Sequence, residues 1–399
     1  MKGKVLSAIL VFVLLFGSGC GNQPQDHDAP ERISTQRFSE FCVIQGTGYF
    51  LHRRETGEKY LYYYDRKGDT IRPLCGRAEC THDLMDCNAW IGEGLGLGVS
   101  DGNLYWVGID FSDGGGGWYI FREKTDGRNR KRLLKLAGVN ENILPLSNSM
   151  ILYDEANMVI CGNRSEIIDG EEVLYAELQS YSLKNGERKT LYQKKCQGVP
   201  VIQIFQGQVY LSVVEQRITE KDGEYLLSSD LELVRYPIEG GEGEVLYKGR
   251  LDFVPYAFYI LDDRILMTAV SSGDNQVYAF HFEDQTIAPE LLFSEEEDYE
   301  VLFLEDDRII GYTYPKLPDF KTKKLKVTDF EGNLILEEES EEKMLDQGRN
   351  QVFGRLFYGS DEDGLYFVYE DNSEPQQLKQ RIVRYSLKDG RATELDEDW

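Results

Sequence analysis

The sequence predicts an all-β protein, a β-propeller built from four-stranded antiparallel blades. Three observations point to this fold class. No long stretch has the 3.6-residue apolar period of an amphipathic helix. Turns rich in Asp, Asn and Gly precede many short apolar strands. A unit in which an aromatic-rich strand runs into a Gly turn and a second short strand recurs at 62–68, 119–127, 181–186, 234–241 and 383–390.

Two kinds of turn order the strands within each repeat. The turns with Asp, Asn and Gly or paired acids lie at 100–103, 261–264, 305–308 and 361–364. Each is followed by an apolar strand, so they mark the joint between the first two strands of a unit. The Gly turns of the recurring unit mark the joint between its last two strands. Gly and Asn supply the positive φ that tight hairpins need.

Pairing the two turn types divides the chain into seven units. They cover 38–75, 92–136, 142–193, 199–248, 252–294, 299–338 and 350–397. A different division of the third or last unit would give six or eight blades. A sandwich would need fewer strands, and a solenoid would need shorter repeats of parallel strands. We expect the ring to close with the strand at 41–44 beside the final strand, which would protect the sheet edges.

The charge balance excludes one class of partner. The 399-residue chain carries 70 Asp and Glu against 44 Lys and Arg, a net charge of −26. Such a surface repels phosphate backbones, which excludes nucleic acid and makes an anionic bilayer a poor partner by charge alone. Acidic runs such as 294–298 and 337–342 are typical of solvated loops. We expect a monomer.

The N-terminus is typical of a bacterial signal peptide. Lys2 and Lys4 precede an apolar run at 5–16, and the small residues 17–19 come directly before Cys20. The run is too short for a permanent membrane span. A Cys in this position resembles a lipobox, whose Cys is acylated and becomes the new N-terminus. Gly17 departs from that pattern, which favours Leu there, and the alternative is an ordinary secretion signal with a chance Cys.

These features predict three segments. Residues 1–19 are the signal peptide, 20–36 are the acylated Cys and a polar tether, and 37–399 are a single propeller domain. The tether has two Pro and no periodic apolar face, as flexible linkers do. The predicted location is the extracytoplasmic face of a bacterial cell membrane, with the acyl chains of Cys20 inserted in the bilayer.

A compact group of Cys and His leaves the first unit. Cys75, Cys80, His82 and Cys87 lie within 13 residues, at the spacing C-x₄-C-x-H-x₄-C. Zn²⁺ takes four such ligands in a tetrahedron, so the residue types predict a structural zinc site. The spacing is not a common one for zinc, because only the first gap between cysteines is as short as usual.

A disulfide is the rival interpretation of the same residues. Thiols oxidise outside the cytoplasm, so the predicted location favours a disulfide slightly over zinc. Cys42, in the first predicted unit, is a fair partner for one of the three cysteines. Connectivity cannot be deduced, since six cysteines besides Cys20 allow 15 pairings. Both interpretations predict a structural clip on the crossover between the first two blades.

Two stretches resemble known propeller proteins. The run from Leu74-Cys75 through Cys80-Thr81-His82 to 87–90 resembles a segment of uncharacterised propeller lipoproteins from Gram-positive gut anaerobes. The turns that follow the aromatic strands resemble DUF5050-type and TolB-like propeller repeats. The resemblance implies a propeller fold and a lipoprotein location, and it brings no activity with it.

The function favoured by the sequence is that of a binding or interaction module. Loops at the channel mouth of a propeller carry binding, and the ligand would be a protein, a glycan or a small molecule. One alternative is a carboxylate-dependent glycoside hydrolase or lyase acting on envelope or dietary polysaccharide. Another is a structural subunit of an envelope complex. The G-x-S-x-G match at 98–102 is followed by a strand, so it indicates a hairpin and no nucleophile elbow.

Overall fold

The computed structural model describes residues 36–397 with short gaps. The gaps are 38–40, 45–46, 55–57, 83–85, 93, 113, 139–148, 153–155, 222–223, 272–273, 291–300, 306–307, 313–321, 342–351, 362 and 375–376. The predictions made for residues 1–35, including the signal peptide and the acylation of Cys20, lie outside the described residues. Among the residues that are described, none forms a helix that could cross a membrane.

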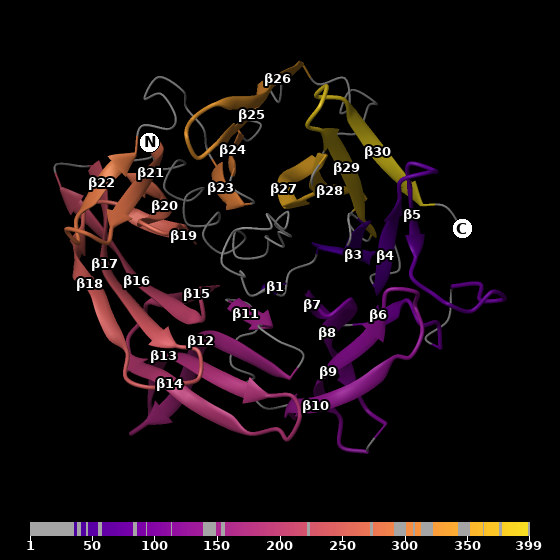
Figure 1. The fold of residues 1–399 in the computed structure, drawn as a ribbon, viewed down its shortest axis with the longest axis horizontal. Helices are drawn as coiled ribbons and strands as arrows, with labels where there is room; N and C mark the ends of the chain where they lie inside the picture. The colour runs from indigo at the N-terminus through magenta and orange to yellow at the C-terminus, as the bar shows by residue number, and fades with distance from the viewer. Residues whose placement is uncertain are drawn as a thin grey trace.

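Of the 30 strands in the described part of the chain, 28 form seven blades around a central axis (Figure 1). The first two blades comprise β2 (Phe41–Ile44), β3 (Thr47–Arg53), β4 (Lys59–Asp65) and β5 (Thr70–Pro73), then β7 (Leu95–Ser100), β8 (Asn103–Asp110), β9 (Gly117–Lys124) and β10 (Lys131–Ala137). The third comprises β11 (Ser149–Leu152), β12 (Asn157–Ile168), β13 (Glu171–Ser182) and β14 (Arg188–Lys195). All pairs within a blade are antiparallel.

The remaining four blades repeat the plan. They comprise β15 (Val199–Phe205), β16 (Gln208–Lys221), β17 (Glu224–Pro237) and β18 (Glu244–Leu251); β19 (Val254–Ile260), β20 (Arg264–Ser271), β21 (Asp274–His281) and β22 (Ile287–Glu290); β23 (Val301–Glu305), β24 (Arg308–Tyr312), β25 (Thr322–Asp329) and β26 (Leu334–Glu341); and β27 (Val352–Ser360), β28 (Gly364–Glu374), β29 (Gln377–Ser386) and β30 (Ala392–Glu397). The prediction of seven four-stranded blades is confirmed.

The hydrophobic core is divided among the seven seams between neighbouring blades. Each core cluster draws its residues from two adjacent blades, and one of the clusters joins blade 7 to blade 1. Strand β4 shows how one sequence serves two seams. Tyr60, Tyr62 and Tyr64 pack toward blade 7, while Leu61 between them packs toward blade 2. Because side chains alternate along a strand, a run of apolar residues can bury both faces of a blade.

The ring closes differently from the prediction. Strand β2 at 41–44 is the first strand of its own blade and pairs only with β3 among the described strands. The final strand, β30, instead pairs in parallel with β5, through Asp396 with Thr70 and Glu397 with Ile71. The expectation that 41–44 lies beside the final strand is therefore wrong. The two outermost strands of blades 7 and 1 make the junction, and they join both blades into one sheet.

Two short strands lie outside the blade plan. Strand β6 (Trp90–Gly92) pairs with β4 where β5 has ended, so it continues the outer edge of blade 1. Strand β1 (Gln36–Arg37) pairs antiparallel with β11, the innermost strand of blade 3, near the central axis (Figure 1).

One acidic run predicted as a solvated loop is part of a strand. Residues 337–341 lie in β26 and pair in register with β25, where Glu337 faces Lys326. Opposite charges across a strand pair stabilise the pairing, which accounts for a strand in so acidic a segment.

Candidate metal centre

The Cys and His residues lie on the segment between β5 and β6 at the outer edge of blade 1, which we call the excursion. The backbone N–H of Leu74 donates to the carbonyl of Leu61 on β4 at 2.8 Å, and the N–H of Leu61 donates to the carbonyl of Ala89 at 2.7 Å. The excursion therefore begins and ends beside the same residue of β4. The chain then re-enters the sheet as β6.

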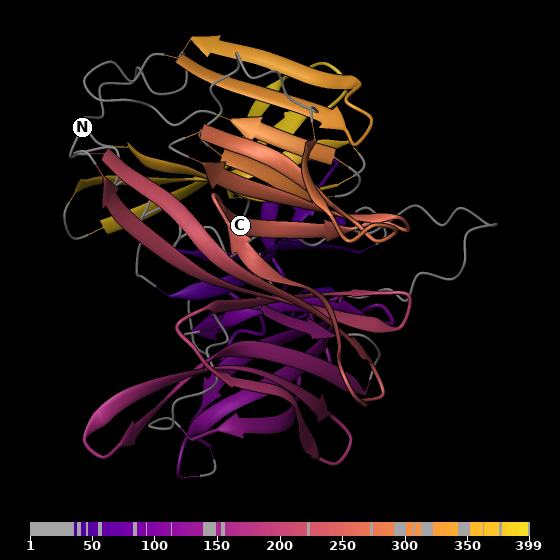
Figure 2. The same cartoon turned by 90° about the vertical axis from the view of Figure 1, so that its left-hand side faces the viewer.

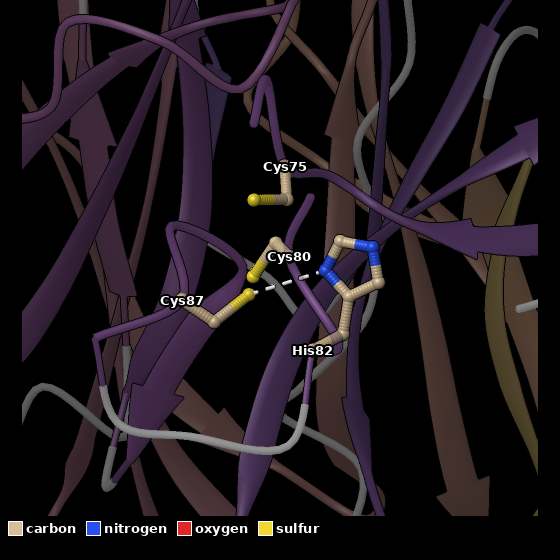
Figure 3. Close-up of side chains that lie close together, drawn as sticks. All are labelled: Cys75, Cys80, His82 and Cys87. Carbon is tan, nitrogen blue, oxygen red and sulfur yellow. Dashed lines mark hydrogen bonds between the residues drawn. The ribbon is translucent and has the colours of Figure 1, made fainter. Parts of the chain in front are cut away.

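Four side chains of this excursion converge on one point. The sulfur atoms of Cys75, Cys80 and Cys87 and a ring nitrogen of His82 all lie within 4.8 Å of one another (Figure 3). The His82 Nδ1 and Cys87 Sγ atoms are 3.4 Å apart. Zinc–sulfur bonds of about 2.3 Å in a tetrahedron place sulfur atoms about 3.7 Å apart, so these four atoms need little movement to enclose an ion. Cys87 is buried, and the other three side chains are partly exposed.

An arginine from blade 1 orients His82. The residue adopts a positive φ of 58°, which is uncommon for residues other than Gly. Arg54 holds this conformation by donating from Nη1 to the carbonyl of His82 at 2.5 Å. The guanidinium is itself fixed, since its Nε donates to the Tyr62 hydroxyl at 2.7 Å and its Cζ lies 3.7 Å from the centre of the Tyr60 ring.

Donors from the backbone and from Arg77 surround the sulfur atoms. The N–H of Ala89 donates to Cys87 Sγ at 3.3 Å, and Arg77 Nη2 donates to Cys80 Sγ at 3.5 Å. Burial raises the pKa of Cys87 to about 12. Burial also acts to raise the pKa of Cys75, but hydrogen bonds from the backbone of Arg77 and Asn88, together with side-chain hydrogen bonds of Arg77 and Cys80, lower that pKa overall.

The excursion docks on the turn between β9 and β10 of blade 2. The carbonyl of Gly127 accepts hydrogen bonds from the N–H of Gly76 at 3.1 Å and from Asn88 Nδ2 at 2.7 Å. Gly127 has a φ of 72°, and a Cβ atom there would lie 2.6 Å from the Gly76 nitrogen. Both its conformation and this close approach require glycine.

A buried ion pair of blade 2 supports the far end of the excursion. Arg130 donates from Nη2 to the carbonyls of Asn88 and Trp90, both at 2.7 Å, and its Nε lies 3.4 Å from Glu123 Oε2. The Glu123 side chain is fully buried. Its Oε1 atom has no hydrogen-bond partner among the described residues. Burial raises the pKa of Glu123 to about 7, even though Arg130 acts to lower it.

The raised pKa of Glu123 predicts a pH-dependent stability. The folded protein holds this proton between the unfolded pKa of about 4.5 and the folded pKa of about 7. The resulting stabilisation is complete below pH 4.5 and is lost as the pH rises through 7. We expect the free energy of unfolding of the wild type, relative to Glu123→Gln, to fall by up to about 3 kcal/mol across this range. Urea denaturation at several pH values measures the difference.

The exposed Glu172→Gln variant is the control for this titration. Its difference from the wild type should stay constant across the same pH range, because this side chain is exposed to water in the folded as well as the unfolded protein. A constant difference for Glu123→Gln as well would contradict the raised pKa.

The structure brings together four of the predicted site residues and places a fifth, Cys42, elsewhere. Cys75, Cys80, His82 and Cys87 form one group, whereas Cys42 lies buried in the core of the seam between blades 1 and 2. None of the six described cysteines forms a disulfide. Cys20 lies outside the described residues.

Sequence reasoning missed the residues that hold the group in place. Arg54 is 28 positions from His82, whose carbonyl it binds. Arg130 holds Asn88, the residue next to Cys87, and Glu123 acts only through Arg130. One signal was available for Glu123. It follows Tyr119 and Phe121 at a period of two, on the face of β9 that packs into the seam.

The arrangement has the chemistry of a structural metal site. A disulfide would engage two sulfur atoms and leave the third sulfur and the imidazole without a role. A metal ion uses all four atoms, and four protein ligands fill a tetrahedron without an open position for substrate. The group also lies at the outer rim of the ring, on the excursion that leaves β5 (Figure 1).

Comparisons with known proteins bear on the fold. No family model and no curated protein matches the chain. Among solved structures it is similar to an acylaminoacyl peptidase of Pyrococcus horikoshii, at 12% identity and a TM-score of 0.48 over 90% of this chain and 52% of that one. It thus spans about half the length of this peptidase.

Two further propellers illustrate the range of these similarities. TolB from Acinetobacter baumannii is similar over 78% of this chain and 65% of that one, at 12% identity and a TM-score of 0.35. An ulvan lyase of polysaccharide lyase family PL25 is similar over 95% and 99%, at 12% identity and a TM-score of 0.43. At this level of identity the likeness concerns the propeller fold alone.

Proposed function

We propose that this chain is a lipid-anchored, extracytoplasmic β-propeller that binds a protein partner on one face of the ring. Each blade has two ends. We call the end where the second and third strands connect the hairpin face, and the end where the first and second strands connect the turn face. The proposal rests on what the chain places on each of these two faces.

The observation that carries the proposal is the pairing of β1 with the innermost strand of blade 3. Gln36 pairs with Leu152, at the end of β11 that leads to β12, and Arg37 pairs with Ile151. Since the connection from β11 to β12 lies on the turn face, the chain enters the ring from that face. Gln36, the first described residue, therefore lies toward the turn face, and we propose that the hairpin face is the one presented to the partner.

The hairpin face carries most of the exposed apolar side chains. Two hairpins are extended, with strands of 12 residues in β12 and β13 and of 14 residues in β16 and β17. Figure 2 shows both projecting on the same side of the ring. Of the eight large hydrophobic side chains exposed in the described part of the chain, five lie on this face in blades 2, 3 and 4: Phe111, Ile167, Ile168, Ile218 and Leu226.

The chemistry of this surface suits a protein partner. Ile167 is 72% exposed and Phe111 is 66% exposed, although both could be polar at no cost to the core. Exposed apolar residues that gather on one face mark interaction sites. Four of the five are aliphatic and pack well against protein side chains, whereas sugars are bound mainly by flat aromatic rings and polar groups.

Site-specific photo-crosslinking on intact cells tests the proposal. A photoreactive amino acid at Ile167 or Ile218 of the full chain should give one covalent adduct of defined mass. The same amino acid at Val245 or Leu334, which are 53% and 57% exposed on outer strands, should give none. Ile167→Glu should also abolish an adduct formed from position 111. Equal adducts from all four positions, or none from any, would refute a partner surface on the hairpin face.

A further inference from the structure

We infer that Cys75, Cys80, His82 and Cys87 bind one Zn²⁺ ion that fastens the ring junction of blades 7 and 1 to blade 2. The inference is independent of the partner proposed above, because the four residues lie on an excursion at the outer edge of blade 1. It starts from the convergence of all four ligand atoms within 4.8 Å.

The ligand set selects the metal. Thiolate sulfur and imidazole nitrogen are the ligands that zinc takes in Cys₃His sites, whereas Ca²⁺ and Mg²⁺ require oxygen. Each thiol gives up its proton to solvent when the metal binds, and the imidazole binds in its neutral form. Three thiolates and Zn²⁺ then carry a net charge of −1.

Arginine side chains lie around the group. Arg77 reaches Cys80 directly, and Arg54 donates to the backbone of His82. Arg128 Nε donates to the carbonyl of Gly76 at 3.3 Å, and Arg130 donates to the carbonyl of Asn88. Two of these guanidinium groups also pair with carboxylates, Arg77 with Asp86 at 3.2 Å and Arg130 with Glu123 at 3.4 Å, and Arg77 is the one that contacts a ligand sulfur atom. Basic residues gathered here stabilise an anionic metal–thiolate centre.

The location gives the ion its role. Cys75 comes two residues after β5 ends, and β5 pairs on its other side with β30. The same excursion is held to Gly127 and Arg130 of blade 2. An ion at this point therefore connects the strand that closes the ring to the neighbouring blade. It also keeps the three thiols from oxidising outside the cytoplasm, because metal-bound thiolates are shielded.

The test is the metal content of the full chain, purified in detergent without chelators. Elemental analysis should find about one zinc per chain. His82→Ala and Cys87→Ser should each reduce this to near zero, whereas Cys161→Ala, at a buried cysteine outside the group, should retain it. Replacing the zinc with cobalt in the wild type should give the intense d–d absorption of tetrahedral thiolate coordination.

The wild-type measurements keep the inference testable if a variant fails to fold. Alkylation of the native protein should leave Cys75, Cys80 and Cys87 unmodified until a chelator or a mercurial releases the metal. The melting temperature should fall when the metal is removed and recover when zinc is returned. A metal-free wild type whose denatured mass shows a disulfide among these cysteines would overturn the inference. Failure of the crosslinking experiment would leave it untouched, since the zinc centre and the hairpin face are separate.

Discussion

Asp361→Ala is expected to destabilise the protein by about 3–5 kcal/mol, the usual result of removing one partner from a buried ion network. Asp361 follows β27, and its side chain is fully buried. Its carboxylate accepts hydrogen bonds from the Tyr366 hydroxyl at 2.6 Å and from the N–H of Asp363 at 2.8 Å. It also pairs with Arg66 at 3.3 Å and Arg384 at 3.6 Å.

These partners come from two sides of the ring junction, which explains the size of the effect. Arg66 belongs to blade 1, while Tyr366 and Arg384 belong to blade 7. Removing the Asp361 carboxylate takes away the negative charge that balances the largely buried Arg384. Urea denaturation measures the loss.

Asp363→Ala is the matched control, because Asp363 pairs with the same Arg66 at 3.1 Å but is 62% exposed. It should change stability by less than about 1 kcal/mol. Equal effects of the two substitutions would show that the buried network does not hold the junction.

Leu395→Ala is expected to cost about 2–5 kcal/mol, the range for truncating a buried leucine. Leu395 lies on the closing strand β30 and is 5% exposed. It belongs to the core cluster of the seam between blades 7 and 1, which also contains Ile71 of β5 and Tyr366 of β28. Removing its side chain leaves a cavity directly beside the parallel pair of Asp396 and Thr70.

Thermal and urea unfolding of Leu395→Ala measure this cost. Leu334→Ala is the control, because Leu334 also lies on an outermost strand but is 57% exposed. Its effect should stay within about 0.5 kcal/mol. If the two variants unfold alike, β30 makes no stabilising contact in this seam, and the proposed ring closure is wrong.

The fold could be predicted from the sequence because its signals are local. The turns at Asn185-Gly186 and Asp389-Gly390 follow aromatic strands in the sequence, and in the structure both glycines take the positive φ that ends a third strand. Gly turns at this joint recur in several blades, and this recurrence allowed the blades to be counted from the sequence. Ring closure was not accessible, since it depends on two residue pairs between β5 and β30 that no sequence pattern distinguishes.

The candidate site was partly predictable for the same reason. Its four ligands lie within 13 residues, so residue type and spacing were enough to select them. The sequence alone left zinc and disulfide open, because both use clustered cysteines. The approach of His82 Nδ1 to Cys87 Sγ and the position of Cys42 in another core region are three-dimensional facts. They favour the metal, and spacing could not have supplied them.

The proposed binding surface was the least predictable feature. The sequence placed any function in the loops at the channel mouth but could not say which mouth. That choice depends on β1, whose two polar residues pair with a strand more than 100 positions away. Ile167 and Ile218 looked like ordinary strand residues, and only the length of their hairpins shows that they extend beyond the seams.

The most direct test of this account is the ratio of photo-crosslinked adduct from Ile167 to that from Leu334, measured on intact cells that express the full chain. The two side chains are similarly exposed, at 72% and 57%, but only Ile167 lies on the hairpin face. We predict an adduct of one defined mass from Ile167 and none from Leu334. The Ile167 adduct should be reduced by an excess of the soluble chain that begins after Cys20. An adduct from Leu334 at equal or higher yield would contradict the assignment of the hairpin face as the binding surface.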